Sequence, residues 1–215
     1  MIHLSLYTQN ETTEQLKKIL TFLLQLYRIS LTKCDFPLRG GIAVGEFDDI
    51  PAKEFDNLQK GLVIGNGFIE AYLLESSYSV KGSKIIFKQN VNLKIERELN
   101  GFITQKIKKI DNDEILYELK WGDLLYLTNN NYSALNSFVD IATSSKWLNH
   151  YYSTLETFLI KEPKDNKHEI YHRIINRLRY NYKYNDLDNF IVNFFNSQCS
   201  ENFKRSFSSF IRSKI

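Results

Sequence analysis

The chain has 215 residues, 43% of them hydrophobic and 14% aromatic, which is enough apolar surface for one generous domain or one domain with an appendage. Its 28 Lys and Arg residues are nearly balanced by 25 Asp and Glu residues, so the net charge of +3 excludes the strongly basic footprint of a nucleic-acid-binding domain. The two cysteines, Cys34 and Cys199, lie far apart in the sequence, which favours reduced thiols over a disulfide framework. We find no leader pattern and no apolar segment of membrane-spanning length, and we therefore expect a cytoplasmic protein without membrane contact.

The first part of the chain predicts a strand, a long helix and a second strand. Residues 2–7 alternate weakly between polar and apolar, as a short strand does. Apolar residues at three- and four-residue spacing over 12–33 predict an amphipathic helix that packs one broad face on a sheet. Pro37 ends this helical pattern, and the segment 36–46 predicts a glycine-bearing strand. Residues 47–60 are acidic and irregular, which predicts a surface loop.

The rest of the chain predicts a helix, further strands and then helices only. The helix opens at Gly65 and runs through Glu75. The predicted strands are Lys84–Lys88, Phe102–Ile110, Ile115–Lys120 and Leu124–Thr128, and the predicted helices lie near 132–142, 146–160, 167–182, 186–196 and 201–213. This order predicts an α+β fold, with a sheet domain over 1–130 and an α-helical C-terminal extension over 131–215.

Two glycine-bearing segments carry the candidate site. A strand with bare backbone beside a helix N-terminus offers N–H groups suited to a phosphate. The alternative is that the glycines only make turns and close packing. Arg39 can grip a phosphate with two N–H groups, or it can pair with Glu46 or Glu75. The candidate nucleotide-binding residues are Arg39, Gly40, Gly41, Gly45, Glu46, Gly65, Asn66 and Gly67.

These residues also carry a family resemblance. The segments Leu38-Arg39-Gly40-Gly41-Ile42-Ala43-Val44-Gly45-Glu46 and Gly65, Ile69-Glu70-Ala71-Tyr72, Leu74-Glu75 resemble the central strand and following helix of class III nucleotide cyclases. The closest likeness is to small stand-alone bacterial members, which include the pyrimidine nucleotide cyclases of antiphage defence. The resemblance spans roughly residues 1–182 and is specific only over 36–75.

The resemblance implies a fold and a chemistry. The fold would be a ferredoxin-like mixed sheet, mainly antiparallel, with packed helices. Intact relatives would convert a nucleoside triphosphate into a 3′,5′-cyclic monophosphate, with Mg²⁺ or Mn²⁺ as cofactor, at a site formed between two copies of the chain. The implied partners are thus a nucleoside triphosphate and a second copy or another chain, with no nucleic acid and no membrane.

The sequence departs from the family at the catalytic residues. Both metal-binding aspartates are missing, because Met1 falls just after the expected place of the second. The transition-state Asn and Arg of purine cyclases are replaced by Ile69 and Leu73. We therefore expect no cyclase activity and no bound metal or cofactor for this chain alone, and its catalytic residues are unknown. Three explanations remain open: the start lies upstream, another chain carries the aspartates, or the domain has become a pseudo-enzyme that binds nucleotides or proteins.

A different motif supplies a remoter alternative. His168-Glu169-Ile170-Tyr171-His172 is a literal H-E-x-x-H, whose histidines would share one helix face and could bind zinc for hydrolysis. The only later glutamate is Glu201, and the start of the helix is polar, which favours an exposed helix with aromatic anchors. An acidic loop with Asp48, Asp49, Glu54 and Asp56 favours solvated charges over a divalent-cation site. The aromatic residues of the C-terminal part predict a core or a dimer interface.

Overall fold

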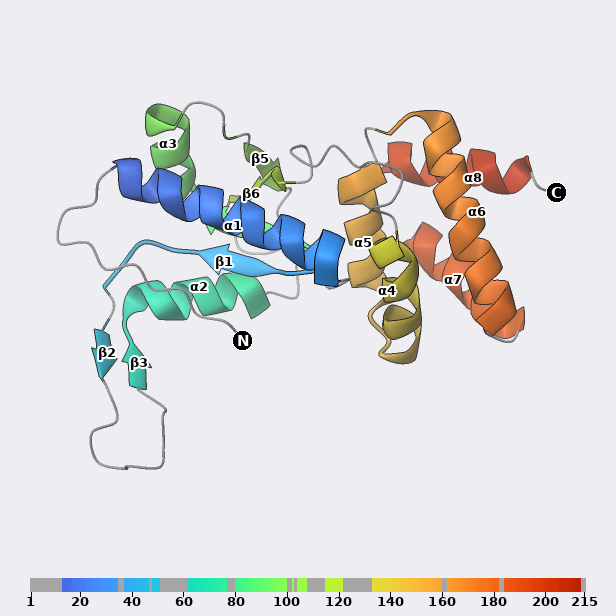
Figure 1. Cartoon of the computed structure of the whole chain (residues 1–215), viewed down its shortest axis with the longest axis horizontal. Coiled ribbons are helices and arrows are strands. Elements are labelled where there is room, and N and C mark those ends of the chain that lie inside the picture. The colour runs from blue at the N-terminus through green and yellow to red at the C-terminus, as the bar shows by residue number, and fades with distance from the viewer. Residues whose placement is uncertain are drawn as a thin grey trace.

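A computed structural model of the chain describes residues 13–34, 37–46, 48–50, 62–76, 80–99, 102, 104–107, 115–121, 133–159, 162–181 and 184–213. The elements, in chain order, are α1 (Thr13–Cys34), β1 (Gly40–Ile42), β2 (Asp48–Ile50), β3 (Leu62–Ile64), α2 (Asn66–Ser76), β4 (Ile85–Lys88), α3 (Gln89–Glu98), β5 (Thr104–Ile107), β6 (Leu116–Leu119), α4 (Ser133–Ser144), α5 (Leu148–Leu159), α6 (Lys164–Asn181), α7 (Tyr184–Asn196) and α8 (Glu201–Arg212) (Figure 1). The α+β class predicted from the sequence is confirmed.

The main sheet has four strands in the order β1-β4-β6-β5. β1 and β4 are parallel and are joined through α2, whereas β4 with β6 and β6 with β5 are antiparallel. β2 and β3 form a separate antiparallel ribbon beyond the first turn of α2 (Figure 1). The predicted strands at 2–7 and 124–128 lie outside the described residues, so the ferredoxin-like topology stays a prediction.

Helices α1 and α2 cover opposite faces of β1 (Figure 1). Successive residues of a strand point to opposite faces, and the two adjacent glycines of β1 show this directly. A Cβ built on Gly40 would meet the hydroxyl of Tyr27 in α1 at 3.0 Å. A Cβ built on Gly41 would lie 2.4 Å from the backbone oxygen of Ala71 in α2. The bare backbone at Gly41 is therefore what allows α2 to approach the strand.

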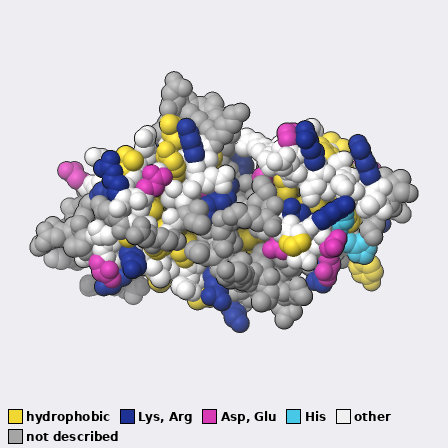
Figure 2. Space-filling model, turned by 90° about the horizontal axis from the view of Figure 1, so that it is seen from above, with side chains coloured by type: hydrophobic (Ala, Val, Ile, Leu, Met, Phe, Trp, Pro, Cys, Tyr) yellow, Lys and Arg dark blue, Asp and Glu magenta, His cyan; other side chains and the backbone are white. Residues whose placement is uncertain are grey.

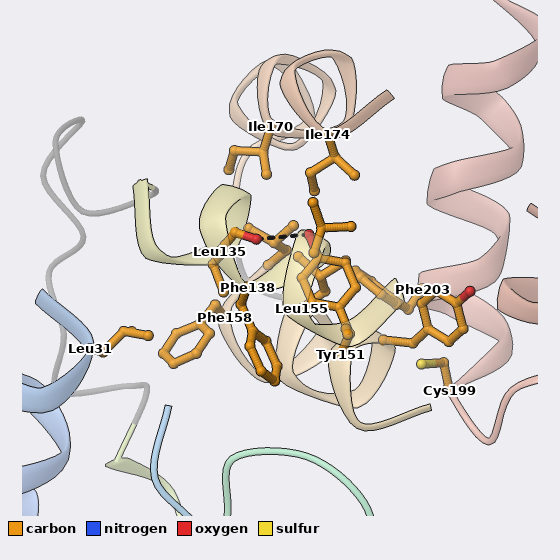
Figure 3. Packing of buried hydrophobic residues seen from close by; sticks show 14 of the residues in the cluster. Leu31, Leu135, Phe138, Tyr151, Leu155, Phe158, Ile170, Ile174, Cys199 and Phe203 are labelled. Carbon is orange, nitrogen blue, oxygen red and sulfur yellow. Dashed lines mark hydrogen bonds between the residues drawn. The ribbon is translucent and has the colours of Figure 1, made fainter. Parts of the chain in front are cut away.

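The α1 face of the sheet shares one hydrophobic core with the C-terminal helices. Trp121, which follows β6, packs edge-on against Tyr27 of α1 and Phe158 of α5, with ring centroids 5.1 and 5.0 Å apart. From there the core continues through α4, α5 and α6 (Figure 3). The hydroxyl of Tyr151 donates to the backbone oxygen of Leu135 at 2.9 Å and ties α5 to α4 (Figure 3). The α2 face has a smaller buried cluster of Leu74, Val80 and Ile86.

The prediction that the aromatic C-terminal part forms a core is confirmed for most of its rings. Buried there are Tyr151, Tyr152, Phe158, Phe190, Phe194, Phe203, Phe207 and Phe210. Helix α8 begins at a side-chain cap, because the hydroxyl of Ser200 accepts a hydrogen bond from the N–H of Phe203. Trp147 and Phe195 are the exceptions, since both are exposed.

Three elements differ from the sequence-based prediction. The segment expected to be an irregular loop contains β2, and β3 (Leu62–Ile64), which pairs with it, lies where a turn into the helix was expected. Helix α3 was not predicted, although its buried residues Val91 and Ile95 are four positions apart, as on one helical face. The three-residue length of β2 and β3 explains their misses, because periodicity needs a longer window to be read.

The surface agrees with the near balance of charges in the sequence. On the face shown in Figure 2, described Lys and Arg side chains are interspersed with Asp and Glu and form no continuous basic stripe. None of the helices described is both long and apolar enough to cross a bilayer.

Candidate functional site

The glycine end of the predicted site is closed by direct backbone contact. A Cβ on Gly45 would lie 2.7 Å from the backbone nitrogen of Gly67, and a Cβ on Gly67 would lie 3.1 Å from that of Gly45. The N–H of Gly67 donates to the backbone oxygen of Glu46 at 3.1 Å. Gly65 has φ of 134°, a conformation that side chains other than glycine rarely adopt. Close packing and a turn thus account for these glycines, and the Gly67 N–H is used within the protein.

Arg39 lies at the other end of the same strand–helix unit. Its guanidinium donates to the backbone oxygen of Val80, in the loop that follows α2. The carboxylate of Glu75, in the last turn of α2, acts on it electrostatically, so of the two pairings considered for Arg39 the structure favours Glu75. Helix α2 has 11 residues and is therefore roughly 16 Å long. Gly45, Glu46, Gly65, Asn66 and Gly67 gather at its start, and Arg39 is separated from them by its length.

The strand register places two lysines beside Arg39. Gly40 pairs with Ile85, and Ile85 pairs with Leu119. Extending this register by one residue beyond the strands places Arg39 beside Lys84 and Lys84 beside Lys120. We call these three residues the basic row. Neighbouring strands are about 4.8 Å apart, so the three backbones lie close together.

The basic row faces the α2 side of the sheet. Side chains alternate along a strand, and Gly41 and Ile86 both contact the α2 side. Arg39 and Lys84 each lie two positions before those residues. Lys120 lies two positions after Glu118, the residue that pairs with Ile86. All three basic side chains therefore emerge on one face.

Glu118 bridges the two lysines of the row. Its Oε2 lies 2.5 Å from Nζ of Lys84, and its Oε1 lies 3.1 Å from Nζ of Lys120. The exposed fractions of the side chains are 6% for Glu118, 16% for Lys84 and 14% for Lys120. A single carboxylate thus holds two ammonium groups in a setting with little water, where charges interact more strongly than at an open surface.

The loop of residues 80–84 brings a third lysine and a histidine to this end. The N–H of Gly82 donates to Nδ1 of His150 at 3.4 Å, and the hydroxyl of Ser153 donates to the backbone oxygen of Lys81 at 2.9 Å. Burial, together with the positive charges of Arg39 and Lys81, lowers the pKa of His150 to about 4. His150 is thus neutral at pH 7, and because its Nδ1 accepts, its proton is on Nε2.

The same region lowers the pKa values of its cations. Burial lowers the pKa of Arg39, although the nearby carboxylate of Glu75 opposes this effect. Burial and the charge of Arg39 lower the pKa of Lys81. Positive charge is therefore concentrated where the sheet, the 80–84 loop and α5 meet.

A second surface feature lies on α2 itself. Ile69, Tyr72 and Leu73 follow one another at three- and four-residue spacing and form one helix face. Their exposed fractions are 53%, 45% and 59%. We call these three residues the α2 apolar face. Glu70 of the same helix pairs with Lys88 at 2.8 Å, which confirms the structural pairing expected for it.

The H-E-x-x-H residues are occupied by contacts within or between helices. The ring of His168 packs edge-on against Phe210 of α8 at 5.4 Å between centroids. Glu169 pairs with Arg173 one turn later, and His172 lies within hydrogen-bonding distance of Asn176. Tyr171 is buried, as expected for an aromatic anchor.

The part of the chain that the structure describes contains no group of three His, Cys, Asp or Glu residues arranged to hold a metal ion. Of the four acidic residues in the predicted loop, Asp48 and Asp49 belong to β2, and Glu54 and Asp56 lie outside the described residues. Neither zinc at the motif nor a divalent cation at the loop gains support from these positions.

The comparisons with known proteins identify no relative, because no family model, curated protein or solved structure matches the chain. The site must therefore be interpreted from its own geometry. Of its residues, sequence reasoning selected Arg39 but missed Lys81, Lys84, Lys120 and His150. Lysines beside strands are common, and only the pairing of β1, β4 and β6 shows that they belong to one group.

Proposed function

We propose that the chain is a nucleotide cyclase-like domain that associates with a second copy of itself through the α2 apolar face and does not cyclise nucleotides unaided. The observation that carries this proposal is the exposure of Ile69 and Leu73. These are the two positions at which the purine cyclases that the sequence resembles have their transition-state Asn and Arg. The α2 surface is thus open to solvent but has apolar groups where those enzymes have polar ones.

The apolar side chains of the α2 apolar face favour association over catalysis. Closing a cyclic phosphate ester needs charged or hydrogen-bonding groups where charge develops in the transition state. Ile69 and Leu73 have neither. Half-exposed Ile, Leu and Tyr side chains instead gain free energy when an interface covers them, at roughly 25 cal/mol per Å² of apolar surface. A two-fold symmetric contact would use the same face of both copies.

The arrangement of β1, α2 and β4 supports the cyclase-like interpretation. The resemblance requires a glycine strand, a helix packed closely upon it and a following strand. β1 and β4 are parallel neighbours with α2 between them, and Gly41 gives the helix its close approach. The support comes from the order and packing of elements, while the activity itself remains to be assayed.

Analytical ultracentrifugation over a range of concentrations tests the association. We expect the wild-type chain to dimerise and Leu73→Glu to remain monomeric, since a buried carboxylate would have no partner at the interface. The matched control is Val192→Glu on α7, where a residue with 57% exposure receives the same charge. A wild-type chain that is monomeric at all concentrations, or a Leu73→Glu variant that dimerises normally, would refute the proposal.

A turnover assay tests the second part of the proposal, that the chain does not cyclise nucleotides unaided. The purified chain is incubated with each of the four ribonucleoside triphosphates and Mg²⁺ or Mn²⁺, and the products are analysed by mass spectrometry. We expect no cyclic nucleotide. Cyclic product that increases with protein concentration would show that these 215 residues contain a complete active site.

A further inference from the structure

Helix α1 has a second apolar stripe besides the face that packs on the sheet. The packed face is marked by Leu20, Tyr27 and Leu31, whose side chains are buried. Helical periodicity places four other apolar residues, partly or half exposed, together on the outer side: Ile19, Phe22, Leu26 and Ile29. Phe22 and Ile29 are each 50% exposed. We call these four residues the α1 outer stripe.

The α1 outer stripe has the spacing of a coiled-coil seam. Its members follow one another at intervals of three, four and three residues, as positions a and d of a heptad repeat do. Side chains at this spacing form a line against which a second helix can pack its own a and d residues. From Ile19 to Ile29 the stripe is roughly 15 Å long, or about three turns of a facing helix. Figure 1 shows α1 on the near side of the sheet, with no other described helix drawn in front of it.

Two lysines flank the α1 outer stripe, one near each end. Lys18 lies four residues before Phe22 and Lys33 lies four residues after Ile29, so both share the side of the stripe. Lys33 is exposed. Lys18 lies 3.9 Å from Glu14, and because these two side chains are 73% and 66% exposed, their pairing is weak. A facing helix with carboxylates near both ends would therefore complement the stripe in charge as well as in shape.

The same lysines argue against α1 of a second copy as the occupant. In an in-register parallel pair each lysine would face its own counterpart, and in an antiparallel pair Lys18 would face Lys33. Both arrangements set ammonium groups against each other, and like charges beside a helical seam oppose pairing. Arg28, on another side of α1, interacts within the chain and does not belong to this surface.

We propose that the α1 outer stripe binds an amphipathic helix of another protein, one with apolar residues at heptad positions a and d and with Asp or Glu residues beside them. Its apolar side chains cover Phe22 and Ile29, and its carboxylates lie near Lys18 and Lys33. This binding is independent of the proposed dimer, because α1 and α2 cover opposite faces of β1 (Figure 1).

A synthetic acidic peptide tests the helical partner. The probe is a fluorescein-labelled peptide of about three heptads with Leu at a and d and Glu at e and g, where the Glu residues keep the peptide from pairing with itself. Its fluorescence anisotropy is measured while the full chain is added, and a peptide of the same composition in scrambled order is the control. We expect only the heptad peptide to bind. Equal binding of both peptides, or binding of neither, would overturn the proposal.

A substitution in the stripe locates the binding on the chain. Ile29→Asp puts a carboxylate into the seam and should weaken binding of the heptad peptide by about tenfold or more. Val192→Asp on α7, where the wild-type side chain is 57% exposed, is the matched control and should bind like the wild type. Circular dichroism checks that both variants are folded. A loss of binding in both variants, or in neither, would count against the α1 outer stripe.

A charge reversal tests the lysines without changing the apolar residues. The double variant Lys18→Glu, Lys33→Glu should prefer a heptad peptide with Lys at e and g, which is the reverse of the wild-type preference. The control double variant Lys106→Glu, Lys164→Glu changes the net charge equally at exposed positions of β5 and α6, and it should keep the wild-type preference. Reversal in both double variants would mean that net charge alone selects the peptide and would refute the assignment to α1.

Two measurements separate this surface from other occupants and from the proposed dimer. Vesicles of phosphatidylserine and phosphatidylcholine that bind the chain, while the heptad peptide does not, would replace the helical partner by a lipid surface. Ile29→Asp should show the same association state as the wild type in ultracentrifugation, and a loss of association would show that a second copy covers α1 instead. Leu73→Glu should bind the heptad peptide like the wild type, so binding at α1 can hold while the α2 dimer fails, and the reverse.

Discussion

Replacing Gly41 by alanine tests whether close packing is what the glycine strand provides. The new Cβ would lie 2.4 Å from the backbone oxygen of Ala71 and 2.8 Å from Cβ of Leu74. Both obstacles are fixed, since one is backbone and the other is the first atom of a buried side chain, so α2 must move away from β1. Overpacking costs about 1–3 kcal/mol, and we expect the upper end, about 3 kcal/mol of unfolding free energy. For a chain of this size that lowers Tm by roughly 6–12 °C.

Urea denaturation followed by circular dichroism measures this loss, and Gly40→Ala is the control. Its Cβ would meet only the hydroxyl of Tyr27, at 3.0 Å, and a side-chain end can move. The expected cost is about 1 kcal/mol, because Tyr27 would lose its hydrogen bond to the backbone oxygen of Lys84. A loss below 1 kcal/mol for Gly41→Ala, or equal losses for both variants, would refute the packing explanation.

Three further predictions concern titratable groups. Glu118→Gln leaves two little-exposed lysines without their carboxylate and should lower the unfolding free energy by about 3 kcal/mol in urea titrations, whereas Glu96→Gln on the exposed side of α3 should change it little. The folded pKa of His150, about 4, lies below its ordinary 6.5, so the unfolded chain binds more protons between these values. Stability from this group is present above about pH 6.5 and falls toward pH 4, and His150→Gln should flatten urea midpoints over that window; an unchanged slope would contradict the assignment. Burial raises the pKa of Cys199 to about 12, so Ellman's reagent should modify exposed Cys34 in the native protein and Cys199 only after denaturation, and rapid native reaction of two thiols would count against this.

Much of the secondary structure could be predicted from the sequence, because its long elements have strong periodic signals. α1 and the five C-terminal helices lie within a few residues of their predicted positions, and β4, β5 and β6 lie inside the predicted strands. Each buries an apolar face that recurs at helical or strand spacing. β2 and β3, with three residues each, depend on pairing with one another, and α3 depends on packing, which a single sequence does not show.

The candidate site was harder to predict, because its residue types have two physical explanations. A glycine strand beside a helix start can present N–H groups to a phosphate, or it can let two backbones touch. The sequence left both open, and the 2.7 Å approach of a Gly45 Cβ to the Gly67 nitrogen supports the second. The basic row was not predictable at all, since it consists of residues 39, 84 and 120, and only strand register brings them together.

The residues that the sequence analysis assigned to one candidate site therefore lie at two different ends of β1. At the α2 N-terminus, hydrogen bonding and contact are satisfied within the chain, so this end holds the helix in position. At the α2 C-terminus, Arg39 donates to the backbone oxygen of Val80 and interacts with the carboxylate of Glu75, and Glu118 bridges Lys84 and Lys120, so this end is organised by charged contacts. The packing contacts of the glycines and the charged contacts of Arg39 thus lie at opposite ends of the same helix.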